Sequence, residues 1–254
     1  MGDAFTRRRF VALGLRGAIG MISAQAVTRR AQAAPGARLR TRPAKPKQRA
    51  QPGRHAFGLG GTRDGYLSVP QNYNPAKPIP FILMLHGRGG GSADLETFCE
   101  AAAKEGIAVA VPDSRGRTWD RIRGQFGPDI DFLERVLAYV FERLAVNPQH
   151  LAIAGFSDGG SYSLSVGLTN GDLFSHVIAY SPQFISAPVC YGKPPVFITH
   201  GMQDRALSAN FSENIVRQLK GWGYQVELKE FSGGHFMRPD LVKESFRWFV
   251  GTGR

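Results

Sequence analysis

Short apolar runs alternate with longer amphipathic stretches from about residue 66 to residue 250, and this alternation sets the fold class. Continuous apolar runs of four or five residues are typical of strands that are covered on both faces of a parallel sheet. The runs of this kind are Phe81–Leu85, Ile107–Val111, Leu151–Ala154, Val177–Tyr180 and Val196–Thr199. Tyr66–Val69 predicts a weaker strand, and the alternating pattern of Tyr224–Phe231 predicts a strand at the edge of the sheet.

Apolar residues at helical spacing predict helices between these strands. The predicted helices are Ala93–Lys104, Ile130–Leu144, Gly159–Leu168, Ala209–Trp222 and Leu241–Val250. Such alternation predicts an α/β fold with a mostly parallel central sheet and helices on both of its faces. Active groups in these sheets gather at the carboxyl ends of the strands, so we expect the chemistry of this chain there.

The excess of positive charge is confined to the first fifth of the chain. Lys and Arg number 32 against 20 Asp and Glu, which gives a formal net charge of +12. Residues 1–54 hold 13 of the basic residues and one acid, Asp3, so residues 55–254 are neutral. A neutral body has no basic face to attract a nucleic acid, and we expect no nucleic-acid partner. No stretch reaches the roughly 18 apolar residues of a membrane span, so none is predicted.

The first 26 residues have the layout of an export signal. Residues 6–11 read TRRRFV, a weakly apolar stretch follows, and residues 24–26 read AQA. A charged start, an apolar stretch and an A-x-A site are the three parts of such a signal, and the paired arginines resemble the twin-arginine signal of bacteria. We therefore predict a signal peptide over residues 1–26, cleaved there or as late as Ala34, and a periplasmic or secreted protein. The alternative is a disordered basic tail.

Residues 27–54 are rich in Arg, Pro and Ala, and Leu39 is their one large aliphatic residue. A segment like this cannot bury enough apolar surface to offset the entropy of ordering it. The sequence therefore predicts a disordered basic linker, followed by one folded domain over residues 55–254. A basic tether to anionic lipid or polymer surfaces is the alternative to a plain linker.

The strand Leu151–Ala154 runs into residues 155–160, which read GFSDGG and contain a G-x-S-x-G motif. The motif alone is weak evidence, but here it follows an apolar strand and opens a helix of small residues. That context is the one that a nucleophile elbow requires, because the glycines allow a sharp turn that exposes the serine. Ser157 is therefore the predicted nucleophile.

A serine nucleophile needs a base, and the base needs an acid that orients it. His235 lies on a Gly-rich loop after the last strand, and Asp204 follows the strand Val196–Thr199. The chain order Ser157, Asp204, His235 is the order expected of a triad on this kind of sheet. A metal site built from histidines and Asp204 is the alternative, but no ligand spacing supports it, and we expect no metal and no cofactor.

An acyl-transfer site also needs hydrogen-bond donors for the oxyanion that develops. The backbone N–H of Asp158, which follows the nucleophile, is one predicted donor. The second is the backbone N–H of Arg88, in the Gly-rich loop of residues 86–91 that follows the strand Phe81–Leu85.

Residues 66–250 resemble an α/β-hydrolase, nearest to the phospholipase/carboxylesterase family and related polyester-depolymerase-like esterases. The resemblance is carried by LHG at residues 85–87, VPD at 111–113, WD at 119–120, GFSDGG at 155–160, HGMQD at 200–204 and GH at 234–235. It implies that Ser157 is the nucleophile, Asp204 the orienting acid and His235 the base. It further implies oxyanion donors at Arg88 and Asp158. Substrate contacts are expected from His86, Gly87 and Trp119, with Trp119 near the substrate entrance.

The chain departs from the family pattern in three places. Asp158 stands where the family often has Gln, and its carboxylate would oppose an oxyanion if it faced inward. Arg88 occupies a position that is usually apolar, and it could neutralise Asp158. Residues 182–194 leave no room for a large lid between two central strands, so we expect an open cleft.

Together these residues predict an exported serine carboxylic-ester hydrolase that works through an acyl-enzyme on a small-molecule or polymeric ester. A thioesterase or lysophospholipase, a hydroxyalkanoate depolymerase-like hydrolase, and a non-catalytic binding protein on the same scaffold are the alternatives. Cys99 and Cys190 could form one disulfide. The sequence specifies neither the ester nor the oligomeric state.

Overall fold

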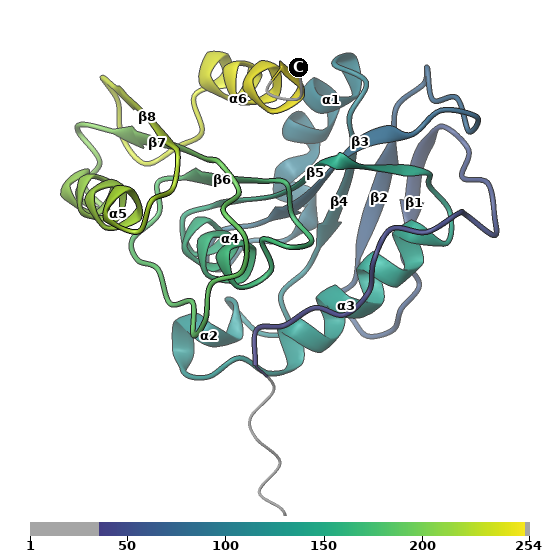
Figure 1. The fold of residues 1–254 in the computed structure, drawn as a ribbon, viewed down its shortest axis with the longest axis horizontal. Helices are drawn as coiled ribbons and strands as arrows, with labels where there is room; N and C mark the ends of the chain where they lie inside the picture. Colours follow the sequence, from purple (N-terminus) through teal and green to yellow (C-terminus); the bar gives the residue numbers. More distant parts are fainter. Residues whose placement is uncertain (1–35, 252–254) are drawn as a thin grey trace, which may run out of the picture. The chain divides into compact units, whose positions relative to one another are not determined.

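The computed structural model describes residues 36–251 (Figure 1). The predicted signal peptide and the start of the predicted linker lie outside the described residues. No helix in the described part of the chain is long and apolar enough to cross a membrane.

A central sheet of eight strands has the order β1-β2-β4-β3-β5-β6-β7-β8. The strands are β1 Gly53–Ala56, β2 Gly65–Val69, β3 Ile79–Leu85, β4 Ala108–Pro112, β5 Val146–Phe156, β6 His176–Tyr180, β7 Val196–Gly201 and β8 Val226–Phe231. β1 and β2 are antiparallel to their neighbours, whereas β4, β3, β5, β6, β7 and β8 run parallel. The carboxyl ends of the parallel strands β3, β5, β7 and β8 therefore lie at the same edge of the sheet.

The helices cover both faces of the sheet. They are α1 Glu96–Lys104, which follows a 3₁₀ turn at Ser92–Leu95, α2 Asp120–Arg123, α3 Pro128–Phe141, α4 Asp158–Thr169, α5 Asn210–Gly221 and α6 Pro239–Gly251. Figure 1 shows α1 and α6 on one face and α3, α4 and α5 on the other. This arrangement confirms the predicted α/β fold.

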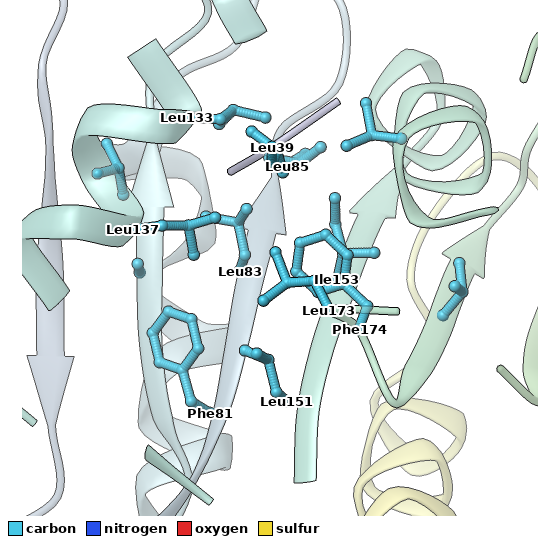
Figure 2. Packing of buried hydrophobic residues seen from close by; sticks show 14 of the residues in the cluster. Leu39, Phe81, Leu83, Leu85, Leu133, Leu137, Leu151, Ile153, Leu173 and Phe174 are labelled. Atoms are coloured by element: carbon cyan, nitrogen blue, oxygen red, sulfur yellow. The ribbon is translucent and has the colours of Figure 1, made fainter. Parts of the chain in front are cut away.

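Side chains of the buried strands divide between two cores, one on each face of the sheet. Successive residues of a strand point to opposite faces. In β3, Leu83 packs toward α3, whereas Met84 packs toward α1 and α6. Figure 2 shows the α3 side, where Leu83, Leu137 and Ile153 are in the same layer. A strand that must fill both cores has no room for polar residues, which explains the continuous apolar runs.

The predicted strands and helices all occur, with boundaries shifted by a few residues, and β8 is the edge strand that its alternating pattern predicted. Sequence reasoning missed β1 and the short α2. Residues 181–195 join β6 to β7 without a helix or strand, so no large lid is present there. Cys99 is buried, Cys190 is exposed, and neither is in a disulfide.

The prediction of a disordered linker is wrong for residues 36–54. The Leu39 side chain is 1% exposed, and its backbone N–H donates to Asn170 Oδ1 at 2.8 Å. Arg38 and Arg42 both pair with Asp172, each at 2.7 Å. The basic residues therefore bind acids of the body, and Figure 1 shows this segment beside α3. Composition alone could not reveal partners that are more than 90 positions away.

Candidate active site

The turn between β5 and α4 holds Ser157 in an unusual backbone conformation. Its φ is 56° and its ψ is −119°, a region that residues other than glycine rarely occupy. The Ser157 N–H donates to the carbonyl of Tyr180 at 2.8 Å, which fixes the turn against β6. A Cβ on Gly155 would collide with Gly159, and a Cβ on Gly159 would collide with the carbonyl of Leu85. Both glycines of the motif are therefore required for the turn to close.

Ser157, His235 and Asp204 form one chain of hydrogen bonds, although they lie on three different loops. His235, on the loop between β8 and α6, has its Nε2 2.9 Å from Ser157 Oγ. Its Nδ1 is 2.6 Å from Oδ2 of Asp204, on the loop between β7 and α5. Because a carboxylate only accepts, Nδ1 carries the ring proton and Nε2 is free to accept from the serine hydroxyl.

The Asp204 carboxylate is buried and well supplied with donors. Its Oδ1 accepts the backbone N–H groups of Ala206 and Leu207, both at 2.8 Å. Burial opposes its ionisation, but the hydrogen bonds from Leu207, His235 and Ala206 prevail and lower the pKa of Asp204. An ionised Asp204 can stabilise a positive charge on His235 during proton transfer.

The Gly-rich loop after β3 lies directly against Ser157. A Cβ on Gly87 would be 3.3 Å from Phe156 Cδ1 and 3.4 Å from the Ser157 Cβ, so a side chain at this position would press on the Phe156 ring. Arg88 is the next residue of this loop, and Asp158 is the first residue of α4. The two predicted oxyanion donors thus come from segments that flank Ser157, and the N-terminus of α4 adds a partial positive charge.

The side chains of these two residues are also bonded to each other. Arg88 Nε–H donates to Asp158 Oδ2 at 2.9 Å, and Thr118 Oγ1 donates to the same oxygen at 2.7 Å. Asp158 is therefore neutralised, as the sequence suggested that it could be. Thr118 is a partner that sequence reasoning missed.

Trp119 does not lie at a substrate entrance, and that prediction is wrong. Its side chain is 0% exposed and stacks on Tyr162 with ring centroids 5.2 Å apart. Its Nε1–H donates to the backbone carbonyl of His86 at 2.9 Å. A buried tryptophan needs such an acceptor for its N–H. Through this hydrogen bond Trp119 holds the first residue of the Gly-rich loop in place.

The His86 imidazole is likewise buried, and hydrogen bonds occupy both of its nitrogens. Nε2 accepts the Ser114 N–H at 2.9 Å, so Nδ1 carries the proton and donates to the Gly87 carbonyl at 2.7 Å. Burial lowers the pKa of His86. Arg63 donates to the carbonyls of Ser114 and Gly90, at 2.7 and 2.8 Å. His86 and Arg63 therefore hold the shape of the loop, and Gly87 lies against Ser157.

A hollow of about 310 Å³ opens beside His235. The Phe156 ring packs on His235 at its wall, with ring centroids 4.8 Å apart. Its lining combines the Gly-rich loop, the turn before α1 and the His235 loop, namely His86, Gly87, Arg88, Gly90, Asp94, Leu95, Phe156, His235, Phe236 and Met237. Among the described residues, no cluster of three or more His, Cys, Asp or Glu side chains could hold a metal ion.

Residues 58–214 match the family model described as "Putative esterase". The chain is 29% identical over 144 residues to the putative esterase NocK of Nocardia uniformis, a match that covers 51% of this chain and 42% of the relative. It is 27% identical over 154 residues to feruloyl esterase C of Emericella nidulans, covering 57% and 56%. The chain thus spans about half the length of these curated relatives. Acyl-protein thioesterase 1 of Gibberella zeae is 24% identical over 212 residues, covering 74% and 84%.

Solved structures of esterases have the same fold. S-formylglutathione hydrolase FrmB of Staphylococcus aureus has a TM-score of 0.64 at 16% identity, covering 80% of this chain and 99% of that one. Esterase Est2 of Thermogutta terrifontis has a TM-score of 0.61 at 19% identity, covering 83% and 96%. These likenesses show the α/β-hydrolase fold.

Proposed function

The chain belongs to the putative esterase family, and on this premise we propose that it hydrolyses carboxylic esters through Ser157, His235 and Asp204. The observation that carries the proposal is the hydrogen-bond chain from Ser157 Oγ through both ring nitrogens of His235 to Asp204. Nucleophile, base and orienting acid stand in the relation that acyl transfer requires.

The reaction begins with attack of Ser157 Oγ on the ester carbonyl while His235 Nε2 takes the hydroxyl proton. The carbonyl oxygen becomes an oxyanion, which the backbone N–H groups of Arg88 and Asp158 stabilise. His235 then gives its proton to the alcohol oxygen, the carbon–oxygen bond breaks, and the acyl group stays on Ser157. Asp204 holds the imidazole in place and offsets its positive charge.

Water completes the cycle by the same steps. His235 takes a proton from a water molecule, the hydroxide attacks the acyl-enzyme, and a second oxyanion forms in the same site. Its collapse breaks the bond to Ser157 Oγ, which recovers its proton from His235, and the carboxylic acid leaves.

The relatives suggest which esters to test first. Feruloyl esterases and an acyl-protein thioesterase are among them, so feruloyl esters and a thioester belong beside simple alkyl esters in one substrate panel. A thioesterase that shares this triad would hydrolyse the thioester with the higher kcat/KM, and the panel separates that alternative from an ester hydrolase.

A fluorophosphonate probe with two matched variants tests the proposal. The probe should label the wild type at Ser157 and should not label Ser157→Ala, and ester hydrolysis by that variant should fall by about 10⁴-fold or more. Ser232→Ala, which removes an exposed serine on the His235 loop, should keep both labelling and hydrolysis. Labelling that survives in Ser157→Ala, or hydrolysis that survives there, would refute the proposal.

We also propose that a twin-arginine signal exports the protein to the periplasm or the medium. The sequence TRRRFV at residues 6–11 and the A-x-A site at residues 24–26 support this. Replacement of Arg7 and Arg8 by Lys should leave the protein in the cytoplasm with its N-terminus uncleaved. Unchanged export of that variant would remove the twin-arginine interpretation.

A further inference from the structure

The proposed function fixes which part of an ester faces His235. Because Nε2 must give a proton to the leaving oxygen, that oxygen comes within hydrogen-bond reach of His235. The carbonyl oxygen must at the same time face the backbone donors of Arg88 and Asp158. The alcohol portion of the substrate therefore leaves Ser157 on the flank that His235 occupies.

The hollow of about 310 Å³ reaches this flank, because His235 is among its lining residues. The loop residues His235, Phe236 and Met237 line it. The Gly-rich loop contributes Gly87 and Arg88, and Leu95 lines the hollow as well. Phe236 is 44% exposed, although it is a large apolar side chain next to the catalytic base. An alcohol that has just accepted its proton from His235 is thus adjacent to an apolar surface.

A second hollow has a volume of about 290 Å³. Met237 lines both, and the second lies between α1 and α6, which Figure 1 shows packed on the same face of the sheet. Its floor contains Phe98 and Val242, both more than nine-tenths buried. Its charged members, Glu100, Lys104 and Lys243, are exposed at the rim. An alkyl or aryl chain suits such a floor better than a charged or sugar-like group does.

We propose that this furrow is a binding site for the alcohol portion of the ester. It runs from His235 over Met237 to the groove between α1 and α6, and it selects esters of extended apolar alcohols. Met237 determines specificity because it is the residue that lines both hollows. The inference rests on the proposed triad, since only a proton delivered by His235 assigns the alcohol to this side.

A pair of isomeric esters tests the assignment. Hexyl acetate and ethyl hexanoate have the same formula and nearly the same hydrophobicity, but their six-carbon chain lies on the alcohol in one and on the acid in the other. The ratio of their kcat/KM values reports the steps up to alcohol release, where the furrow acts. We expect wild-type enzyme to favour hexyl acetate by about tenfold, as apolar pockets discriminate chain length. An equal or reversed preference would overturn the inference.

Two variants test whether the furrow causes the preference for hexyl acetate. Met237→Trp places a bulkier side chain at the position that lines both hollows. It should bring the ratio of the two kcat/KM values close to one. Met202→Trp is the matched control, because Met202 is 56% exposed on the Asp204 loop and lines neither hollow, and it should keep the wild-type ratio. An unchanged ratio in Met237→Trp would overturn the role of this residue.

A third variant keeps the inference testable if Met237→Trp does not fold. Ala101 lies in the groove between α1 and α6, away from the triad, and Ala101→Trp should lower kcat/KM for decyl acetate about tenfold relative to hexyl acetate. If the ratio of kcat/KM for decyl acetate to that for hexyl acetate is the same in Ala101→Trp as in wild type, the α1–α6 extension is overturned.

Failure of the inference is distinguishable from failure of the proposed function. If Ser157 takes up the fluorophosphonate and both isomers are hydrolysed without preference for hexyl acetate, the triad stands and the alcohol site is wrong. If Ser157 is not labelled and neither isomer is hydrolysed, the proposed function is wrong and the alcohol site falls with it.

Discussion

Arg88 and Asp158, whose backbone N–H groups are the predicted oxyanion donors, are joined by an ion pair of 2.9 Å between Nε and Oδ2. The Asp158 side chain is 9% exposed, whereas that of Arg88 is 63% exposed. A carboxylate so close to a developing oxyanion would raise the energy of the transition state. Arg88 offsets that charge and at the same time ties the Gly-rich loop to the start of α4.

Removal of the Arg88 side chain should therefore lower kcat, chiefly because the negative charge of Asp158 loses its ion-pair partner. We expect Arg88→Ala to lower kcat by roughly tenfold to hundredfold, since an unpaired carboxylate near the oxyanion costs that much at an effective dielectric constant of about 20. Adding Asp158→Asn to Arg88→Ala should restore part of the loss. The measurement is kcat and KM for one ester across the two single variants and the double variant.

The sign of the coupling decides this prediction. A double variant that is more active than Arg88→Ala supports charge compensation, because merely structural damage would add. Arg117→Ala removes an exposed arginine from the neighbouring loop and should leave kcat unchanged. If the double variant is as inactive as Arg88→Ala or worse, charge compensation is not what Arg88 provides.

Gly159 should not tolerate even one methyl group. A Cβ there would collide with the backbone carbonyls of Leu85 and His86. Leu85 ends β3 and His86 begins the Gly-rich loop, so neither carbonyl can move independently. We expect Gly159→Ala to lose most esterase activity and to destabilise the fold by about 1–3 kcal/mol, as overpacking does. Gly221→Ala in α5 is the matched control, because a Cβ there meets nothing within 4 Å and alanine favours a helix. Thermal unfolding and kcat/KM of both variants check the contrast.

The sequence predicted the elements that carry Ser157, Asp204 and His235 because local patterns encode those elements. The apolar run before Ser157 must be a buried strand, the glycines around it permit one kind of turn, and the loops of Asp204 and His235 follow strands of the same sheet. Parallel strands bring their carboxyl ends to one edge, so three distant residues could be assigned to one site without coordinates.

Positions that depend on long-range contacts could not be predicted in this way. The family resemblance placed Trp119 near the substrate entrance, but Trp119 is buried and its N–H donates to the carbonyl of His86. Leu39 lies among arginines and prolines, and its burial depends on Asn170, which is 131 positions away. The pattern of residues around Trp119 or Leu39 does not indicate either of these hydrogen-bond partners.

The segment that contains Leu39 should contribute to the stability of the domain. Leu39 packs in the core shared with α3 and α4, beside Leu85 and Leu133 in Figure 2. Replacement of a buried leucine by alanine costs about 2–5 kcal/mol, and we expect Leu39→Ala to lower the free energy of unfolding by that amount. Lys45→Ala, at an exposed position of the same segment, should stay within about 0.5 kcal/mol of wild type. Equal stabilities of the two variants in urea unfolding would contradict the packing of this segment.

His176 should make the protein less stable in weak acid. It is 4% exposed at the start of β6, and it packs against the rings of Phe249 and His150, with centroids 5.1 and 6.3 Å away. Burial, and to a lesser extent the neighbouring His150, lowers the pKa of His176 to about 4. The unfolded chain takes up this proton near pH 6.5, so between about pH 6.5 and 4 it binds more protons than the folded chain.

The free energy of unfolding should therefore fall as the pH drops through this window, by at most roughly 3 kcal/mol from His176. Urea unfolding at pH 7 and pH 4.5 measures the fall for wild type, for His176→Gln and for His55→Gln, which replaces a histidine that is only half-buried at the sheet edge. His176→Gln should lose distinctly less stability on acidification than wild type, because it cannot take up this proton, whereas His55→Gln should follow wild type. Titrating groups that lie away from His176 and His55 are common to the three proteins and cancel in the comparison. Parallel losses in wild type and His176→Gln would mean that His176 is not held neutral by its surroundings.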